Sequence, residues 1–155
     1  IELNGTEHNS IAANATKLAN NALTLAVENG ETFDFSSDVN LDAKLTSASV
    51  ASGGTLTISE AQAHGITITG TGSLVVTGVD GDTDLGNLAS GLTVTSTITV
   101  ADTNISGSSD LANVDNFSLG NGIDATMTIL QHNKISAADG SNTVTLSENG
   151  TISIF

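Results

Sequence analysis

Short runs of alternating apolar and polar residues recur along most of this chain. In the clearest stretch, residues 55–78, three apolar runs lie at 56–58, 66–68 and 74–76, and threonine flanks each of them. Glycine or a small polar residue separates one run from the next. Alternating β-branched residues bounded by glycine are typical of β-strands. Because the rest of the chain repeats this pattern with variations, the sequence predicts an all-β protein.

Apolar residues at the predicted strand centres fall into two series along the chain. Within each series the members follow one another at nearly regular intervals. The first series is Leu23, Leu41, Leu56, Leu74, Leu92, Leu111, Met127 and Val144, and the second is Phe35, Val50, Ile66, Leu85, Val100, Phe117, Ile135 and Ile152. Together they predict a strand about every 8 or 9 residues, a spacing that fits a stacked β-solenoid and a β-sandwich equally well.

A longer internal similarity favours the solenoid. Apolar residues of the first half recur in the second half at a nearly constant interval: Phe35 as Ile105, Leu45 as Val114, Leu56 as Met127 and Leu74 as Val144. A fixed period indicates a repeat architecture, in which each coil buries its apolar face against its neighbours. We therefore predict one β-repeat domain over residues 1–155, with related repeats at about 33–103 and 104–155. Each coil would contain about 17.5 residues. A β-sandwich or jelly roll is the alternative.

The two ends of the chain differ from the repeats. Residues 1–22 form a predicted cap, because Ser10 can begin a short helix whose apolar face consists of Ile11, Ala15, Leu18 and Ala22. At the other end, an alternating strand stops without a polar cap. Because an open apolar strand tends to pair with another strand, we expect either that the natural chain continues or that another subunit completes the sheet. This predicted assembly strand consists of Thr151, Ile152, Ser153, Ile154 and Phe155.

A single helical turn is predicted at residues 59–65. Ser59 is a suitable N-cap and Gly65 is a suitable stop. Glu60 and His64 are four residues apart, so a helix would place both on one face, where such a pair can bind a transition metal. No third ligand is evident in the sequence, and an ordinary surface turn is the alternative.

Composition narrows the classes of partner. The chain has 17 acidic residues against 3 basic ones, a net charge of -14 and no tryptophan or tyrosine. Nucleic-acid binding depends on Lys and Arg, and aromatic rings provide the surfaces on which bases and sugars stack. No run approaches the ~20 apolar residues of a membrane-spanning helix. We therefore expect no nucleic acid, no membrane insertion and no small-molecule substrate.

The densest acidic cluster is a candidate calcium site. Asp80, Asp82 and Asp84 alternate in a glycine-containing loop, and several carboxylate oxygens in one loop can bind calcium. The EF-hand pattern is absent, so a solvated acidic corner is the alternative. A weaker candidate set consists of Asp102, Asn104 and Asp110. Apart from calcium, we expect no cofactor.

Threonine rows give a second candidate site. Thr93, Thr95, Thr97 and Thr99 alternate with other residues, so a strand would place all four on one face. Stacked across coils, such rows would form a flat, regular array, which is the principle of ice-binding solenoids. The alternative is an ordinary outward strand face that is filled with a good β-former.

Several segments resemble a known group of proteins. Residues 56–63 (Leu-Thr-Ile-Ser-Glu-Ala-Gln-Ala), 70–77 (Gly-Thr-Gly-Ser-Leu-Val-Val-Thr) and 92–95 (Leu-Thr-Val-Thr) are similar to the repeat regions of very large secreted bacterial surface proteins. These include adhesins, surface-layer proteins and matrix proteins. The similarity is strongest over residues 45–120 and fainter over 121–155. The resemblance implies an extracellular, non-enzymatic role that is structural or adhesive.

The sequence therefore predicts an extracellular or cell-surface structural protein and no enzyme. It has no Gly-x-Ser-x-Gly elbow, no cysteine nucleophile and no phosphate-binding glycine-rich loop. The expected role is a self-assembling subunit of a filament, layer or matrix, a homo-oligomer or homopolymer joined by pairing of open strands. The alternatives are a calcium-stabilised adhesin module of a larger surface protein, and ice binding through the threonine rows.

Overall fold

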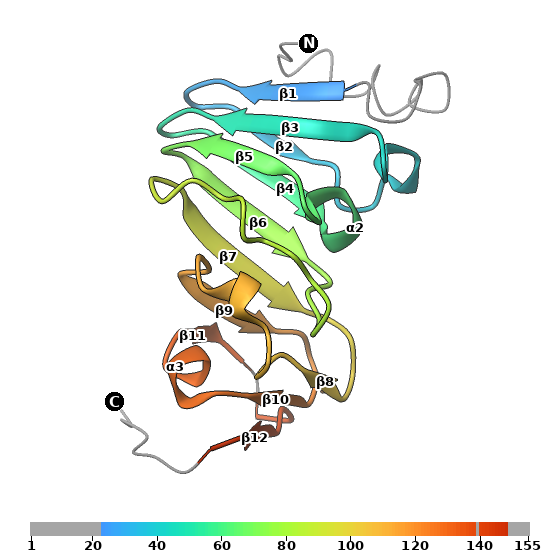
Figure 1. The fold of residues 1–155 in the computed structure, drawn as a ribbon, viewed down its shortest axis with the longest axis vertical. Helices are drawn as coiled ribbons and strands as arrows, with labels where there is room; N and C mark the ends of the chain where they lie inside the picture. Colours follow the sequence, from blue (N-terminus) through green and yellow to red (C-terminus); the bar gives the residue numbers. More distant parts are fainter. Residues whose placement is uncertain (1–22, 139, 149–155) are drawn as a thin grey trace.

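The computed structural model describes residues 23–138 and 140–148 (Figure 1). The predicted N-terminal cap (1–22) and the predicted assembly strand (151–155) lie outside the described residues. Within them, the chain forms twelve strands and four very short helices. The mostly-β class that the alternating pattern predicts is therefore confirmed.

The strands are short and follow one another closely. They are β1 (Leu23–Val27), β2 (Thr32–Asp34), β3 (Leu45–Val50), β4 (Thr55–Ser59), β5 (Thr67–Gly70), β6 (Ser73–Thr77), β7 (Thr93–Ile98), β8 (Thr103–Asn104), β9 (Asn116–Leu119), β10 (Ala125–Met127), β11 (Ile135–Ala137) and β12 (Val144–Leu146). Between them lie the α-helices α2 (Glu60–Ala63) and α3 (Ile129–His132) and the 3-10 helices η2 (Val39–Leu41) and η3 (Ser109–Leu111).

All strand pairs in the described part of the chain are parallel. They form three open sheets, ordered β1-β3-β5, β11-β9-β7-β6-β4-β2 and β12-β10-β8. Consecutive strands alternate between the six-stranded sheet and one of the other two, except that β6 and β7 are neighbours in the six-stranded sheet. In Figure 1 the strands of each sheet follow one another down the long axis in sequence order, from β1 near the top to β12 near the bottom.

Neighbouring strands of one sheet are further apart in the sequence than the pattern predicts. Phe33 is paired with Leu56, Leu56 with Leu74 and Leu74 with Val94. The step from Leu56 to Leu74 is as short as any between paired residues of the described strands. Paired residues of neighbouring strands are therefore typically about 20 residues apart. The predicted coil of about 17.5 residues is wrong, because it leaves too little room for the helices and loops that connect the strands.

The two predicted series also mix residues from strands and connections. Leu41 and Leu111 are buried, but they lie in η2 and η3 rather than at strand centres. Val100 lies after the end of β7 and is 45% exposed, so its predicted place in a strand is wrong. Other steps of the series are true neighbours, as for Leu56 and Leu74.

The core is continuous along the six-stranded sheet. Leu56, Leu74 and Val94 lie in register on the same face of β4, β6 and β7, and none is more than 1% exposed. Phe117 of β9 is fully buried on the same face. Because alternate residues of a strand point to opposite faces, the other face of β4, β6 and β7 carries threonine and serine, with Val75 as the exception.

The second half of the structure repeats the first. The 3-10 helix η2 begins at Val39 and η3 begins at Ser109, while α2 begins at Glu60 and α3 at Ile129. The register repeats as well, since Leu56 is paired with Leu74 and Ala125 is paired with Val144. Leu56 therefore corresponds to Ala125, two residues before the position that the sequence comparison assigns to it. The β2, β4 and β6 strands of the six-stranded sheet thus have their counterpart in the sheet β8-β10-β12.

Candidate functional site

The helical turn predicted at residues 59–65 is present as α2. The Ser59 hydroxyl accepts a hydrogen bond from the backbone N–H of Gln62 (3.3 Å), and the Ser59 N–H donates to the side-chain oxygen of Gln62 (3.1 Å). Thr128 and Gln131 make the same pair of bonds at α3, at 3.2 and 2.8 Å. Each capping box satisfies two N–H groups at the start of its helix.

The two capping glutamines also make hydrogen bonds to an earlier connection, and these contacts were not predicted from the sequence. Gln62 is 2% exposed, and its Nε2 donates to the carbonyl oxygens of Phe35 (3.0 Å) and Asp38 (2.9 Å). Gln131 Nε2 donates to the carbonyl oxygen of Ile105 (2.8 Å). We call η2 with α2 the first corner, and η3 with α3 the second corner. The sequence signal for this pair is a Ser/Thr-x-x-Gln pattern, which occurs at 59–62 and again at 128–131.

The predicted calcium ligands Asp80, Asp82 and Asp84 lie in the loop after β6. Asp80 Oδ1 accepts hydrogen bonds from the Asp82 N–H (3.0 Å) and the Thr83 hydroxyl (3.2 Å), and Asp84 Oδ1 accepts from the Gly86 N–H (2.9 Å). In the described ranges, no three His, Cys, Asp or Glu side chains lie close enough together to hold a metal ion. Calcium at this loop stays a prediction.

His64 joins α2 to the acidic loop. Its Nδ1 lies 2.9 Å from Glu60 Oε1, as expected for residues four apart on a helix, and 3.3 Å from the backbone N of Asp84. Nδ1 must carry a proton to donate to Glu60, but it must be unprotonated to accept from Asp84. The two contacts are therefore alternatives, and the position of the proton selects between them.

The weaker acidic set is built into a turn. Asn104 Oδ1 accepts from both the N–H (3.0 Å) and the hydroxyl (2.7 Å) of Ser106. At the equivalent position of the first half, Asp34 Oδ1 accepts in the same way from Ser36, at 2.9 and 2.6 Å. These side chains therefore shape the chain where it leaves β8 and β2. Asp102 and Asp110 are exposed beside the later turn.

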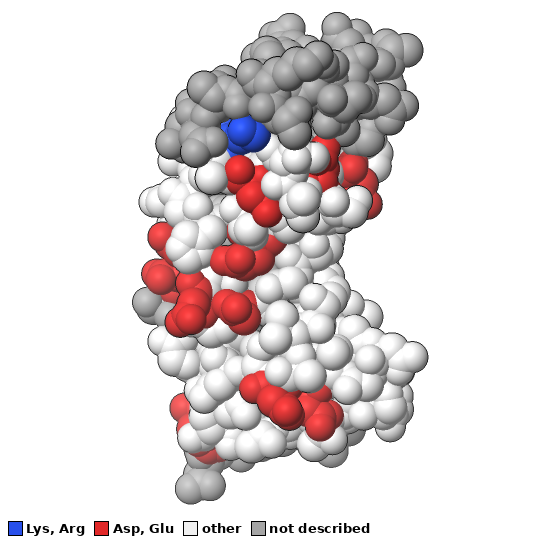
Figure 2. All heavy atoms as spheres, turned by 90° about the vertical axis from the view of Figure 1, so that its right-hand side faces the viewer, with Lys and Arg blue, Asp and Glu red and all other residues white. Residues whose placement is uncertain are grey.

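Acidic side chains make up most of the charged surface. Figure 2 shows them in several groups along one side of the molecule, with little basic surface beside them. This distribution agrees with the net charge of -14. Such a surface repels other acidic surfaces at low ionic strength and keeps a protein soluble.

The structure places Thr93, Thr95 and Thr97 on the outward face of β7, and Thr99 just beyond the end of the strand. These threonines extend into rows that cross three neighbouring strands. The rows are Thr55–Ser73–Thr93, Thr57–Val75–Thr95 and Ser59–Thr77–Thr97. The rows continue onto β2 through Thr32 and Asp34, and onto β9 through Asn116 and Ser118.

The outward face of the six-stranded sheet differs in charge from the rest of the surface. Among the paired positions of β2, β4, β6, β7 and β9, the only charged residue on this face is Asp34. It lies at one end of a row. Hydroxyls and methyl groups thus form a regular grid. Its spacings are roughly 4.8 Å between strands and roughly 6.6 Å between alternate residues of one strand.

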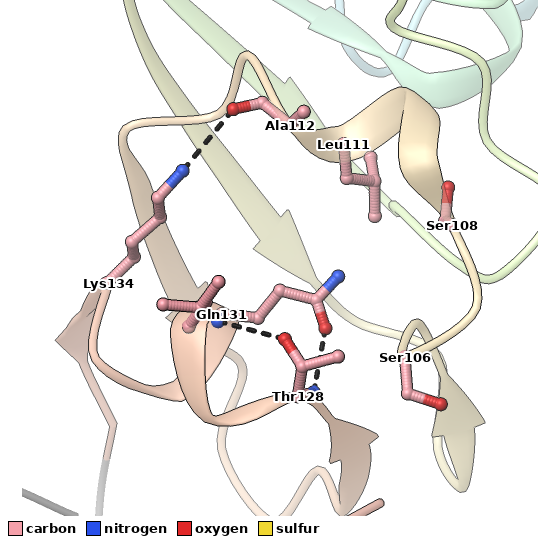
Figure 3. A pocket seen from close by; sticks show the side chains of 8 residues that line it. Ser106, Ser108, Leu111, Ala112, Thr128, Gln131 and Lys134 are labelled. Atoms are coloured by element: carbon pink, nitrogen blue, oxygen red, sulfur yellow. Dashed lines mark hydrogen bonds between the residues drawn. The ribbon is translucent and has the colours of Figure 1, made fainter. Parts of the chain in front are cut away.

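A pocket of about 340 Å³ lies in the second corner, between η3 and α3 (Figure 3). Lys134 stands at one side, where its Nζ donates to the carbonyl oxygens of Val114 (2.6 Å) and Ala112 (3.3 Å). The pocket is lined by Ser106, Ser108, Leu111, Ala112, Thr128, Leu130, Gln131 and Lys134. No local sequence pattern predicts this pocket, because its lining comes from two segments that only folding brings together.

Two further findings bear on function. Among the described residues, no helix has the length and apolar character needed to cross a lipid bilayer. Comparison of the chain with known protein families, with curated proteins and with solved structures gives no match.

Proposed function

We propose that the chain is a β-solenoid segment that serves as a structural subunit of an extracellular or cell-surface filament, layer or matrix. The strand pairing carries this proposal. All described pairs are parallel, and each joins strands that are nearly one constant step apart in the sequence. A chain that adds one strand to each of two sheets per turn stacks its coils along one axis. A β-sandwich or jelly roll would instead pair antiparallel strands.

The proposed role is non-enzymatic. The polar side chains at the corners are engaged in holding the backbone, as Gln62, Asp80 and Asp84 illustrate. Each of these groups makes hydrogen bonds to backbone N–H or C=O groups in the connections between strands. Their arrangement is therefore explained by folding, without a substrate.

Open strands support self-assembly. In the described residues, β11 and β12 are the last strands of their sheets, and Ile135 and Val144 are only partly buried. The free edge of a terminal strand offers N–H and C=O groups to another strand. We propose that residues 151–155 of one copy supply such a strand to a second copy. Repetition of this contact, head to tail, gives a polymer.

Negative-stain electron microscopy of the purified chain tests this proposal. We expect filaments or sheets, and we expect truncation after Asn149 to abolish them. Ile154→Asp should weaken assembly because it puts a charge among the alternating apolar residues. Ser153→Asp adds the same charge on the opposite side of the proposed strand and is the matched control. Isolated particles of the full chain, or assemblies that survive the truncation, contradict the terminal-strand mechanism.

Ice binding is the second candidate, and the threonine grid is the observation that favours it. A rigid face with regular hydroxyls and methyl groups, nearly free of charge, would hold water in an ordered layer. Thermal hysteresis of the freezing point tests this function. We expect Thr95→Lys, at the centre of the grid, to abolish the hysteresis. Thr69→Lys adds the same charge on the outward face of β5 and should leave it unchanged. Absence of hysteresis in the unsubstituted chain rules this candidate out.

A further inference from the structure

The two corners share the order of their helices and the capping box, but they differ in the side chains around the helix. The second corner repeats η2 as η3 and α2 as α3, in the same order along the chain. At the second corner, Leu111 and Gln131 repeat Leu41 and Gln62 of the first. Half of the positions that line the pocket differ between the corners in charge or in apolar character. Those differences indicate which class of ligand the pocket can bind.

The second corner has lost two carboxylates. Asp38 of the first corner corresponds to Ser108, and Asp42 corresponds to Ala112. As a result, none of the residues that line the pocket is acidic. The exposed Asp110 replaces Asn40, but it is not part of the lining. In a chain with 17 acidic residues, the pocket is thus a place without negative charge.

The second corner has also gained a cation. Lys134 occupies the position of Gly65, and its ammonium group is held at the edge of the pocket by the carbonyl oxygens of Ala112 and Val114. An ammonium group has three N–H donors, so two bonds to carbonyls leave one donor for a ligand. The carbonyl contacts fix the group in place, which lowers the entropy that binding would cost.

An exposed apolar side chain completes the contrast. Leu130 is 75% exposed and replaces Ala61 of the first corner. The buried Leu111 contributes further apolar surface to the pocket. Covering Leu130 removes apolar surface from water, which is favourable. Ser106 and Ser108 lie at the opposite side from Lys134 (Figure 3), and the Ser106 hydroxyl donates its proton to Asn104.

We propose that this pocket binds a small organic carboxylate with a short apolar tail. The carboxylate accepts a hydrogen bond from Lys134 Nζ, and the tail covers Leu130 and Leu111. A volume of about 340 Å³ lies near the lower limit of ligand pockets, so the ligand is small. The ligand is held without being transformed. The first corner, with its two carboxylates and no lysine at the position of Lys134, does not bind it.

NMR titration of the ¹⁵N-labelled full chain tests the proposal with three probes that share one tail: hexanoate, 1-hexanol and hexylammonium. We expect hexanoate to shift the signals of Thr128 and Gln131. The alcohol should bind at least about tenfold more weakly, because it lacks the charge-assisted bond to Lys134. Hexylammonium should cause no shift. Equal affinity for hexanoate and hexanol would overturn the proposal, and so would the absence of any shift with hexanoate.

Variants at the pocket identify the residues that bind. Leu130→Ala and Ala112→Asp restore, at exposed positions, the residue types of the first corner, and each should weaken hexanoate binding several-fold. Lys134→Gln should weaken it about tenfold. Lys44→Gln removes the other lysine of the described chain and is the matched control, with unchanged affinity. Lys134 also donates hydrogen bonds to two backbone carbonyls. The hexanoate affinity of Lys134→Gln is therefore compared with that of the unsubstituted chain only if both have the same melting temperature. Affinity that is unaffected by Leu130→Ala and Ala112→Asp contradicts the proposed site.

Discussion

Gln131 repeats, in the second half of the chain, the role that Gln62 has in the first. The side-chain amide of Gln62 donates to the carbonyl oxygen of Phe35 at 3.0 Å, and that of Gln131 donates to the carbonyl oxygen of Ile105 at 2.8 Å. Gln62 makes an additional bond to Asp38, and it is buried. Glutamine therefore makes the contact in both corners, but the glutamine of the first corner makes one more hydrogen bond to a carbonyl and is buried.

Substitution of the two glutamines by leucine should have unequal effects. Gln62→Leu removes two hydrogen bonds to carbonyls at a buried site and one capping bond, so we expect a loss of about 2–4 kcal/mol in the free energy of unfolding. Gln131→Leu removes one hydrogen bond to a carbonyl at a half-buried site, and we expect the free energy of unfolding to fall by about 1–2 kcal/mol. Urea denaturation measures both. Equal losses in the two variants would contradict the difference between the corners.

Ser96 of β7 is fully buried, and its hydroxyl has no hydrogen-bond partner among the described residues. Its neighbours in register are Val76 and Phe117, which are fully buried and apolar. Because an unsatisfied buried hydroxyl is unfavourable, Ser96→Ala should raise the free energy of unfolding by about 1 kcal/mol. Ser118→Ala, on the outward face of β9, is the control and should change it by less than about 0.5 kcal/mol. A clear loss of stability in Ser96→Ala argues that the hydroxyl has a partner.

Gly70 cannot accept a side chain. Its φ is +117°, and a Cβ atom at this position would lie 2.0 Å from the carbonyl oxygen of Val50. That carbonyl accepts hydrogen bonds from the N–H groups of Thr71 and Gly72, so it is not free to move. We expect Gly70→Ala to destabilise the protein by about 3 kcal/mol or more. Gly107→Ala, where nothing lies within 4 Å, is the control for thermal unfolding. Similar melting temperatures for the two variants would contradict this expectation.

Calcium binding by Asp80, Asp82 and Asp84 predicts that calcium raises the melting temperature and that a chelator reverses the rise. Asp82→Asn should abolish this increase, because Asp82 is an exposed member of the cluster and its loss removes a charged ligand. Glu28→Gln removes one charge elsewhere on the surface and is the matched control. A similar rise in both variants would instead indicate diffuse screening of the net charge of -14. Differential scanning calorimetry distinguishes these outcomes.

The sequence by itself determined which residues face inward. Alternation has a period of two in a strand, so Leu56, Ile58, Leu74 and Val76 could be assigned to the core before any partner was known. The capped turn at Ser59 was equally predictable, because a capping box is a local interaction between residues three apart. The similarity between the two halves was also visible, since it needs only the order of residue types.

Only the tertiary structure decided which strands are neighbours and where their register lies. A slip of two residues keeps every side chain on its face, so alternation could not distinguish Ala125 from Met127 as the counterpart of Leu56. The lengths of the connections decide that register, and they depend on packing at the corners. The pocket beside Lys134 has the same origin, because it arises where two separate segments of the sequence, η3 and α3, meet. Local patterns determine faces and caps, whereas register and cavities depend on contacts between distant segments.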